Sequence, residues 1–152
     1  MFAGFSAGFD QLRDEPTEWK QGGQGYGRRF GSWFGRGAID GTIQSGVAIL
    51  DGEDPRYRRS TKKGFWARSM AAAFQSMFPY TTRGGRTFAF SRVAGSFSSG
   101  FISNAWYPDS LSHTSDALAR GARGLGGDVG NAVFLEFWPD IKKKLPHRKR
   151  KP

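Results

Sequence analysis

Glycine recurs at every fourth position near the start of this chain, at Gly23, Gly27, Gly31 and Gly35. A four-residue period places these glycines in one row along an α-helix. Each glycine inside a helix costs about 1 kcal/mol relative to alanine, so the row gives up about 4 kcal/mol of helix propensity. We therefore expect a helix from Gly23 to Leu50 whose glycine row is packed closely by another backbone, as small-residue rows are in membrane helices.

The aromatic residues are expected to form the other half of that packing. Glycine and phenylalanine are abundant, at 22 and 14 of 152 residues, which predicts a core of aromatic side chains set against glycine and alanine. In the central helix, Tyr26, Phe30 and Trp33 share one face. The charged residues of this helix lie away from that face, at Arg28, Arg29, Arg36 and Asp40.

Other segments also repeat apolar residues at helical spacing. Helices are expected over Phe2 to Leu12, Gly64 to Phe78, Phe88 to Trp106, and from Ser112–Ser115 to Trp138, where Pro139 should end the last one. The start of the third segment alternates like a strand, but its later spacing favours a helix. The sequence thus predicts an all-α bundle of about four or five helices. We expect one helical domain over residues 1–140 and a flexible basic tail over residues 141–152.

A second small-residue row supports close helix packing. Ser91, Gly95, Ser99 and Ser103 recur at every fourth position within the segment from Phe88 to Trp106. Two rows offer more close-packing surface than one small bundle needs. We therefore expect the rows to dock helices against each other, against a second copy of the chain, or against a membrane-associated protein partner.

The basic residues concentrate at the end of the chain. The last eleven residues carry no acid and most of the net charge of +10, at Lys142, Lys143, Lys144, Arg148, Lys149, Arg150 and Lys151. A tail of this kind commonly binds an anionic membrane surface or nucleic acid. Nucleic acid would also need stacking partners, such as Tyr57, Phe65 or Trp66. The simpler interpretation is a tail that keeps an aromatic-rich domain soluble.

No pattern of polar residues predicts a catalytic, cofactor or metal site. The chain lacks cysteine, and the glycine-rich stretches 22–27 and 124–130 lack the preceding strand of a phosphate loop. His113 with Asp116 fits the start of a helix better than a catalytic pair. Glu136, Trp138 and Asp140 are expected to form a clasp at a helix end. Asp51, Glu53 and Asp54 are expected to form a salt-bridged turn with Arg56, Arg58 and Arg59. We expect a protein without enzymatic activity.

Five stretches together resemble a family of small bacterial proteins, found mostly in acidobacteria and usually made with a secretion signal. They are GQGYGRRFG (23–31), EDPRY (53–57), GGRTFAFSRVAG (84–95), SNAWYP (103–108) and FLEFWPDIKKKL (134–145). The resemblance spans roughly residues 4 to 145 and carries no assigned activity. It implies a location in the cell envelope. The stretch from Met1 to Phe9 itself has neither the charge nor the length of a signal peptide.

The leading hypothesis is therefore a structural or interaction protein, associated with the envelope or a membrane, whose helices dock through the glycine rows on themselves or on a partner. The alternative is a nucleic-acid-binding protein that uses the basic tail.

Overall fold

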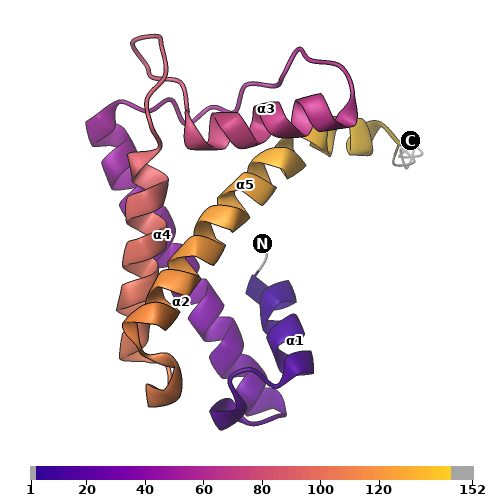
Figure 1. Cartoon of the computed structure of the whole chain (residues 1–152). Helices are drawn as coiled ribbons and strands as arrows, with labels where there is room; N and C mark the ends of the chain where they lie inside the picture. Colours follow the sequence, from indigo (N-terminus) through magenta and orange to yellow (C-terminus); the bar gives the residue numbers. More distant parts are fainter. Residues whose placement is uncertain (1–2, 145–152) are drawn as a thin grey trace, which may run out of the picture. The chain divides into compact units, whose positions relative to one another are not determined.

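The structure, a computed structural model, describes residues 3–144 and is helical through most of them (Figure 1). The predicted all-α class is confirmed. The described residues form five α-helices, listed here with their bounds: α1 (Ala3–Arg13), α2 (Gly23–Asp51), α3 (Phe65–Met77), α4 (Phe90–Ile102) and α5 (Thr114–Lys144). Short 3-10 turns lie between some of them, and extended pairing in the described part is limited to two isolated bridges.

The residues group into two compact units. Among the described residues, unit 1 comprises 3–51 and 90–125, and unit 2 comprises 52–89 and 126–144. The expectation of one domain over residues 1–140 stays a prediction, because two compact units can belong to a single domain.

Unit 1 is built on α2. Both α1 and α4 pack against it, α1 alongside its first half (Figure 1). The helix ends where the sequence predicted, because Gly52 adopts a positive φ of 68° that a side chain would disfavour. At the start of α5, the Asp116 carboxylate accepts the His113 backbone N–H at 3.2 Å, which caps the helix as expected of a cap-region histidine.

The second small-residue row forms the contacts of α4 within unit 1. Ser91, Ser99 and Ser103 are almost completely buried. A Cβ atom on Gly95 would lie 2.5 Å from Asp40 Oδ1 of α2. The row therefore brings the α4 backbone directly onto a neighbouring helix, as its spacing predicted.

The interior differs from the aromatic core that the composition predicted. Apart from Pro16 and Pro79, the apolar side chains that are buried in the described part of the chain are alanines, at Ala7, Ala72, Ala89, Ala117 and Ala132. Many phenylalanines and tryptophans are instead 37% or more exposed. Small side chains allow backbones to approach so closely that large rings have no space between them. The prediction of buried aromatic side chains was therefore wrong.

In unit 2, α5 continues past the proline that was expected to end it. Pro139 lies inside α5, which ends at Lys144. The side chain of Arg68 on α3 reaches both sides of this proline, with Nε 2.7 Å from Glu136 Oε1 and Nη2 2.7 Å from Asp140 Oδ2. These ion pairs join residues one turn apart and offset the hydrogen bond that proline cannot donate.

Candidate functional site

The outward face of α2 carries the glycine row. A Cβ atom built on Gly23, Gly27 or Gly31 meets no atom beyond its own part of the helix within 4 Å, and one on Gly35 only reaches the Trp106 ring, at 4.0 Å. The row therefore packs against no other helix within unit 1. Its use for docking stays a prediction, now directed at something outside the described residues.

A groove lies along this row. It encloses about 660 Å³, and its lining includes Gly31 and Gly35, the side chains of Ala38 and Ile39, and the indoles of Trp19 and Trp106. We call it the α2 groove. At Gly31 and Gly35 the backbone of α2 itself lines the groove, because glycine has no side chain, so another helix can approach α2 closely at these two positions.

Three exposed aromatic rings border the row. Tyr26, Phe30 and Phe34 stack along the helix, with ring centroids 6.4 Å and 6.3 Å apart. Phe34 is 63% exposed and Phe30 is 41% exposed. Burying one such ring would contribute about 2 kcal/mol, so the ridge is a surface that favours association.

The opposite face of α2 buries arginines, although the sequence analysis set them away from the packed face. Arg29 is completely buried. Its guanidinium donates to the backbone carbonyls of Glu15 (2.8 Å), Pro16 (2.9 Å) and Lys20 (2.8 Å), and pairs with Asp14 at 3.2 Å. Arg29 therefore holds the loop between α1 and α2, and it is a structural residue rather than part of an exposed site.

The basic residues of the tail are only partly described. Lys142, Lys143 and Lys144 form the last turn of α5, where Lys142 and Lys143 are exposed. Cations at this position favour the negative end of a helix dipole. Arg148, Lys149, Arg150 and Lys151 lie outside the described residues, so their predicted role is untested.

Unit 2 contains a buried carboxylate that accepts three hydrogen bonds. Glu136 is 0% exposed and accepts from Tyr57 Oη (2.9 Å), the Ser60 backbone N–H (3.0 Å) and Arg68 Nε (2.7 Å). Burial alone would raise the pKa of Glu136, but the hydrogen bonds from Ser60, Arg68 and Tyr57 outweigh it and hold the pKa below its usual value. The pKa of Asp140 is also lowered, mainly by its hydrogen bond from Arg68. Glu136 and Asp140 thus join a set of contacts that ties α3 to α5, but the cluster lies within α5 rather than at a helix end as the sequence predicted.

These lowered pKa values predict that unit 2 loses stability in acid. A carboxyl whose pKa is lower in the folded state stabilises fully above its unfolded pKa, about 4 for Asp and Glu, and loses that contribution as pH falls through the folded pKa. Thermal unfolding followed by circular dichroism should be constant from pH 7 to 5 and fall below about pH 4. Glu136→Gln should be less stable at pH 7 and show a shallower acid loss. An acid loss as steep as that of the unmodified chain would contradict the assignment.

The other polar groups that the sequence analysis weighed have structural partners. Asp54 accepts from the Arg56 backbone N–H at 3.0 Å and pairs with Arg58 at 2.9 Å, which confirms the salt-bridged turn. Within residues 3–144, no group of three or more His, Asp or Glu side chains is arranged to hold a metal. A search of the same residues found no helix with the length and apolar character to cross a membrane.

A second pocket in unit 1, which the sequence did not predict, brings Arg36 of α2 together with Arg120 and Arg123 of α5. The sequence held one weak indication of this pocket: Arg29 and Arg36 are seven residues apart and so share one helix face.

Comparisons of the chain with protein-family models, with curated proteins and with solved structures gave no match.

Proposed function

We propose that this chain is a non-enzymatic interaction protein that pairs with a second copy of itself through the α2 groove and the aromatic ridge beside it. The observation that carries the proposal is the open space around Gly23, Gly27 and Gly31. The row costs about 4 kcal/mol of helix propensity, and three of its four glycines are open, so it calls for a contact outside unit 1.

A second copy fits this face because the face complements itself. Phe30 directly precedes Gly31, and Phe34 directly precedes Gly35, so each ring lies about 100° around the helix from the next glycine. In a two-fold pair the same patch serves both partners. The ridge of one copy then enters the groove of the other, and the converse contact forms at the same time.

The charges of α2 also favour pairing of like helices. Arg29 and Arg36 are buried in unit 1, and Asp40 is half-buried. Arg28 is the charged residue that lines the α2 groove. Two copies can therefore bring these faces together with little repulsion between like charges.

An envelope or membrane-associated location belongs to the same proposal. The resemblance to an exported family supports it, as does the use of small-residue rows for close helix contacts in membranes. The exposed Lys142 and Lys143 are suited to an anionic surface, to which each basic residue contributes about 1 kcal/mol.

Single cysteines test the proposed contact, because the chain has none of its own. Gly27→Cys, Gly31→Cys and Gly35→Cys would be oxidised mildly and run on non-reducing gels. A disulfide needs Cα atoms about 4.4–6.8 Å apart, so at least one of these variants should give a covalent dimer in high yield. Gly127→Cys, on an exposed and open position of α5, is the matched control. Equal yields at α2 and at the control position would overturn the proposal.

A further inference from the structure

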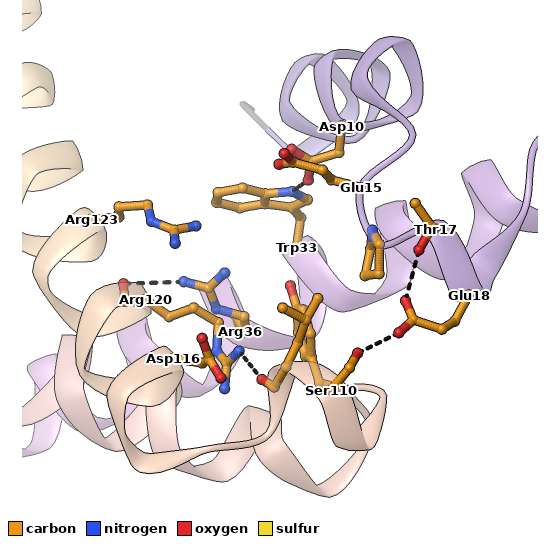
Figure 2. Close-up of a pocket in the computed structure, with 13 residues that line it drawn as sticks. Asp10, Glu15, Thr17, Glu18, Trp33, Arg36, Ser110, Asp116, Arg120 and Arg123 are labelled. Atoms are coloured by element: carbon orange, nitrogen blue, oxygen red, sulfur yellow. Dashed lines mark hydrogen bonds between the residues drawn. The ribbon is translucent and has the colours of Figure 1, made fainter.

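Unit 1 contains a pocket that is separate from the α2 groove. It encloses about 550 Å³, within the usual range for small-molecule sites. Figure 2 shows Arg36, Arg120 and Arg123 on one side of it and Asp10 and Glu15 on another. The pocket is thus polar, with opposite charges on different walls.

Two of these arginines are buried without a carboxylate partner. Arg36 is 7% exposed and Arg120 is 4% exposed, and neither forms an ion pair with a carboxylate among residues 3–144. Each guanidinium lies over an aromatic ring, Arg36 over Trp33 at 4.9 Å and Arg120 over Tyr107 at 4.4 Å. Arg36 Nη2 donates to the Arg120 carbonyl at 3.4 Å, and Arg120 Nη1 donates to the Leu111 carbonyl at 2.8 Å. Arg120 Nη2 donates to the Gly100 carbonyl and to Asn104 Oδ1. The Nε atoms of both have no hydrogen-bond partner. Buried unpaired cations are costly, so this wall favours an anion.

A third arginine adds positive charge to this wall, while Asp40 on α2, whose charge interacts with that of Arg36, and Asp116 on α5 form no ion pair with Arg36 or Arg120 in the described residues. Arg123 is exposed and lines the pocket mouth. Asp116 lines the pocket too, but it caps α5 through the His113 N–H and forms no ion pair with an arginine. Burial and then the nearby Arg36 and Arg123 charges lower the pKa of Arg120, although the Tyr107 and Asp116 charges oppose this.

The opposite wall is acidic and limits the ligand to one anionic group. Asp10 accepts from Trp33 Nε1 at 2.6 Å, and Glu18 accepts from the Ser110 hydroxyl. The Glu15 side chain is exposed beside them. These carboxylates would repel a polyanion such as nucleic acid or a nucleoside triphosphate, and they would attract an ammonium group.

We propose that this pocket binds a small zwitterion of the phosphoethanolamine type, with its phosphate on Arg36, Arg120 and Arg123 and its ammonium toward Asp10 and Glu15. Three guanidinium groups exceed what the two oxygens of a carboxylate can accept, whereas a phosphate presents more oxygens. The same chemistry occurs in the free compound and in a lipid headgroup.

Calorimetric titration of the full chain with phosphoethanolamine tests the proposal. Saturable binding is expected, and at least tenfold weaker binding of inorganic phosphate. ATP should not compete. Arg123→Gln should weaken binding at least tenfold without unfolding risk, because Arg123 is exposed. Glu15→Gln should remove the preference for phosphoethanolamine over phosphate. Arg13→Gln, at an exposed arginine outside the pocket, is the control and should bind normally.

Vesicles distinguish the two sources of the ligand. Pelleting with phosphatidylethanolamine vesicles, but not with phosphatidylcholine vesicles, and its loss in Arg123→Gln, would support a lipid headgroup. Binding of the free compound alone would support a soluble ligand. The proposal is overturned if neither form binds, if ATP binds more tightly than phosphoethanolamine, or if Arg123→Gln and Arg13→Gln behave alike. None of these outcomes depends on pairing through α2.

Discussion

Replacing Gly27 and Gly31 by leucine together is expected to weaken pairing of the chain about 100-fold while leaving the fold intact. Both positions are open and exposed, so the new side chains meet nothing within unit 1. The leucine side chains would keep a partner helix from approaching the α2 backbone as closely as the proposed pairing requires. Because leucine is a better helix former than glycine, the monomer should also become more stable, by up to about 2 kcal/mol.

Sedimentation velocity would measure the association, and chemical unfolding at low protein concentration would measure the monomer. Gly126→Leu with Gly127→Leu is the matched control, since both positions are open and exposed in α5. It should leave pairing unchanged. A variant at Gly27 and Gly31 that keeps both its oligomeric state and its stability would show that the glycine row has no docking role.

Gly100→Ala is expected to have the opposite effect on stability. A Cβ atom at this position would lie 2.5 Å from the Ala117 carbonyl oxygen and 3.1 Å from the Gly121 backbone nitrogen. Both are backbone atoms of α5, so α4 and α5 would have to move apart. Overpacking of this kind costs about 1–3 kcal/mol and sometimes more. We expect a net loss of about 2 kcal/mol, measured by denaturant unfolding.

Gly41→Ala is the control for that substitution. Gly41 is exposed in α2, and a Cβ atom there meets nothing within 4 Å. The same chemical change should then stabilise the protein by about 1 kcal/mol, through helix propensity alone. If Gly100→Ala were also stabilising, the close contact of α4 with α5 would be wrong.

Helix positions were predictable from this sequence, whereas the choice of buried face was not. Apolar spacing located all five helices, and Gly52 fixed the end of α2. Periodicity defines the two faces of a helix without saying which one is covered. Hydrophobicity favoured burying the aromatic face of α2, but Arg29 is buried because loop carbonyls satisfy its donors. Those partners are set by tertiary structure.

The same limit applies to the sites. The glycine row itself could be predicted, because its spacing is local, but its being open within unit 1 could not. The arginine pocket could not, since Arg36 and Arg120 are 84 residues apart in sequence and meet only when α2 and α5 fold into one unit. Likewise, the ion pairs that Arg68 of α3 forms on either side of Pro139 in α5 are set by tertiary structure.

The alanine and serine interior has a consequence for how this protein tolerates change. In an ordinary core, stability falls when large side chains are shortened, because cavities form. Here the buried positions other than the hydrogen-bonded arginines and glutamates are mostly alanine and serine, already near the lower limit of side-chain size. At these positions the damaging changes are therefore enlargements. Selection on the interior would therefore mainly exclude side chains larger than those present. Selection for apolar side chains would instead act on the surface that contacts a partner.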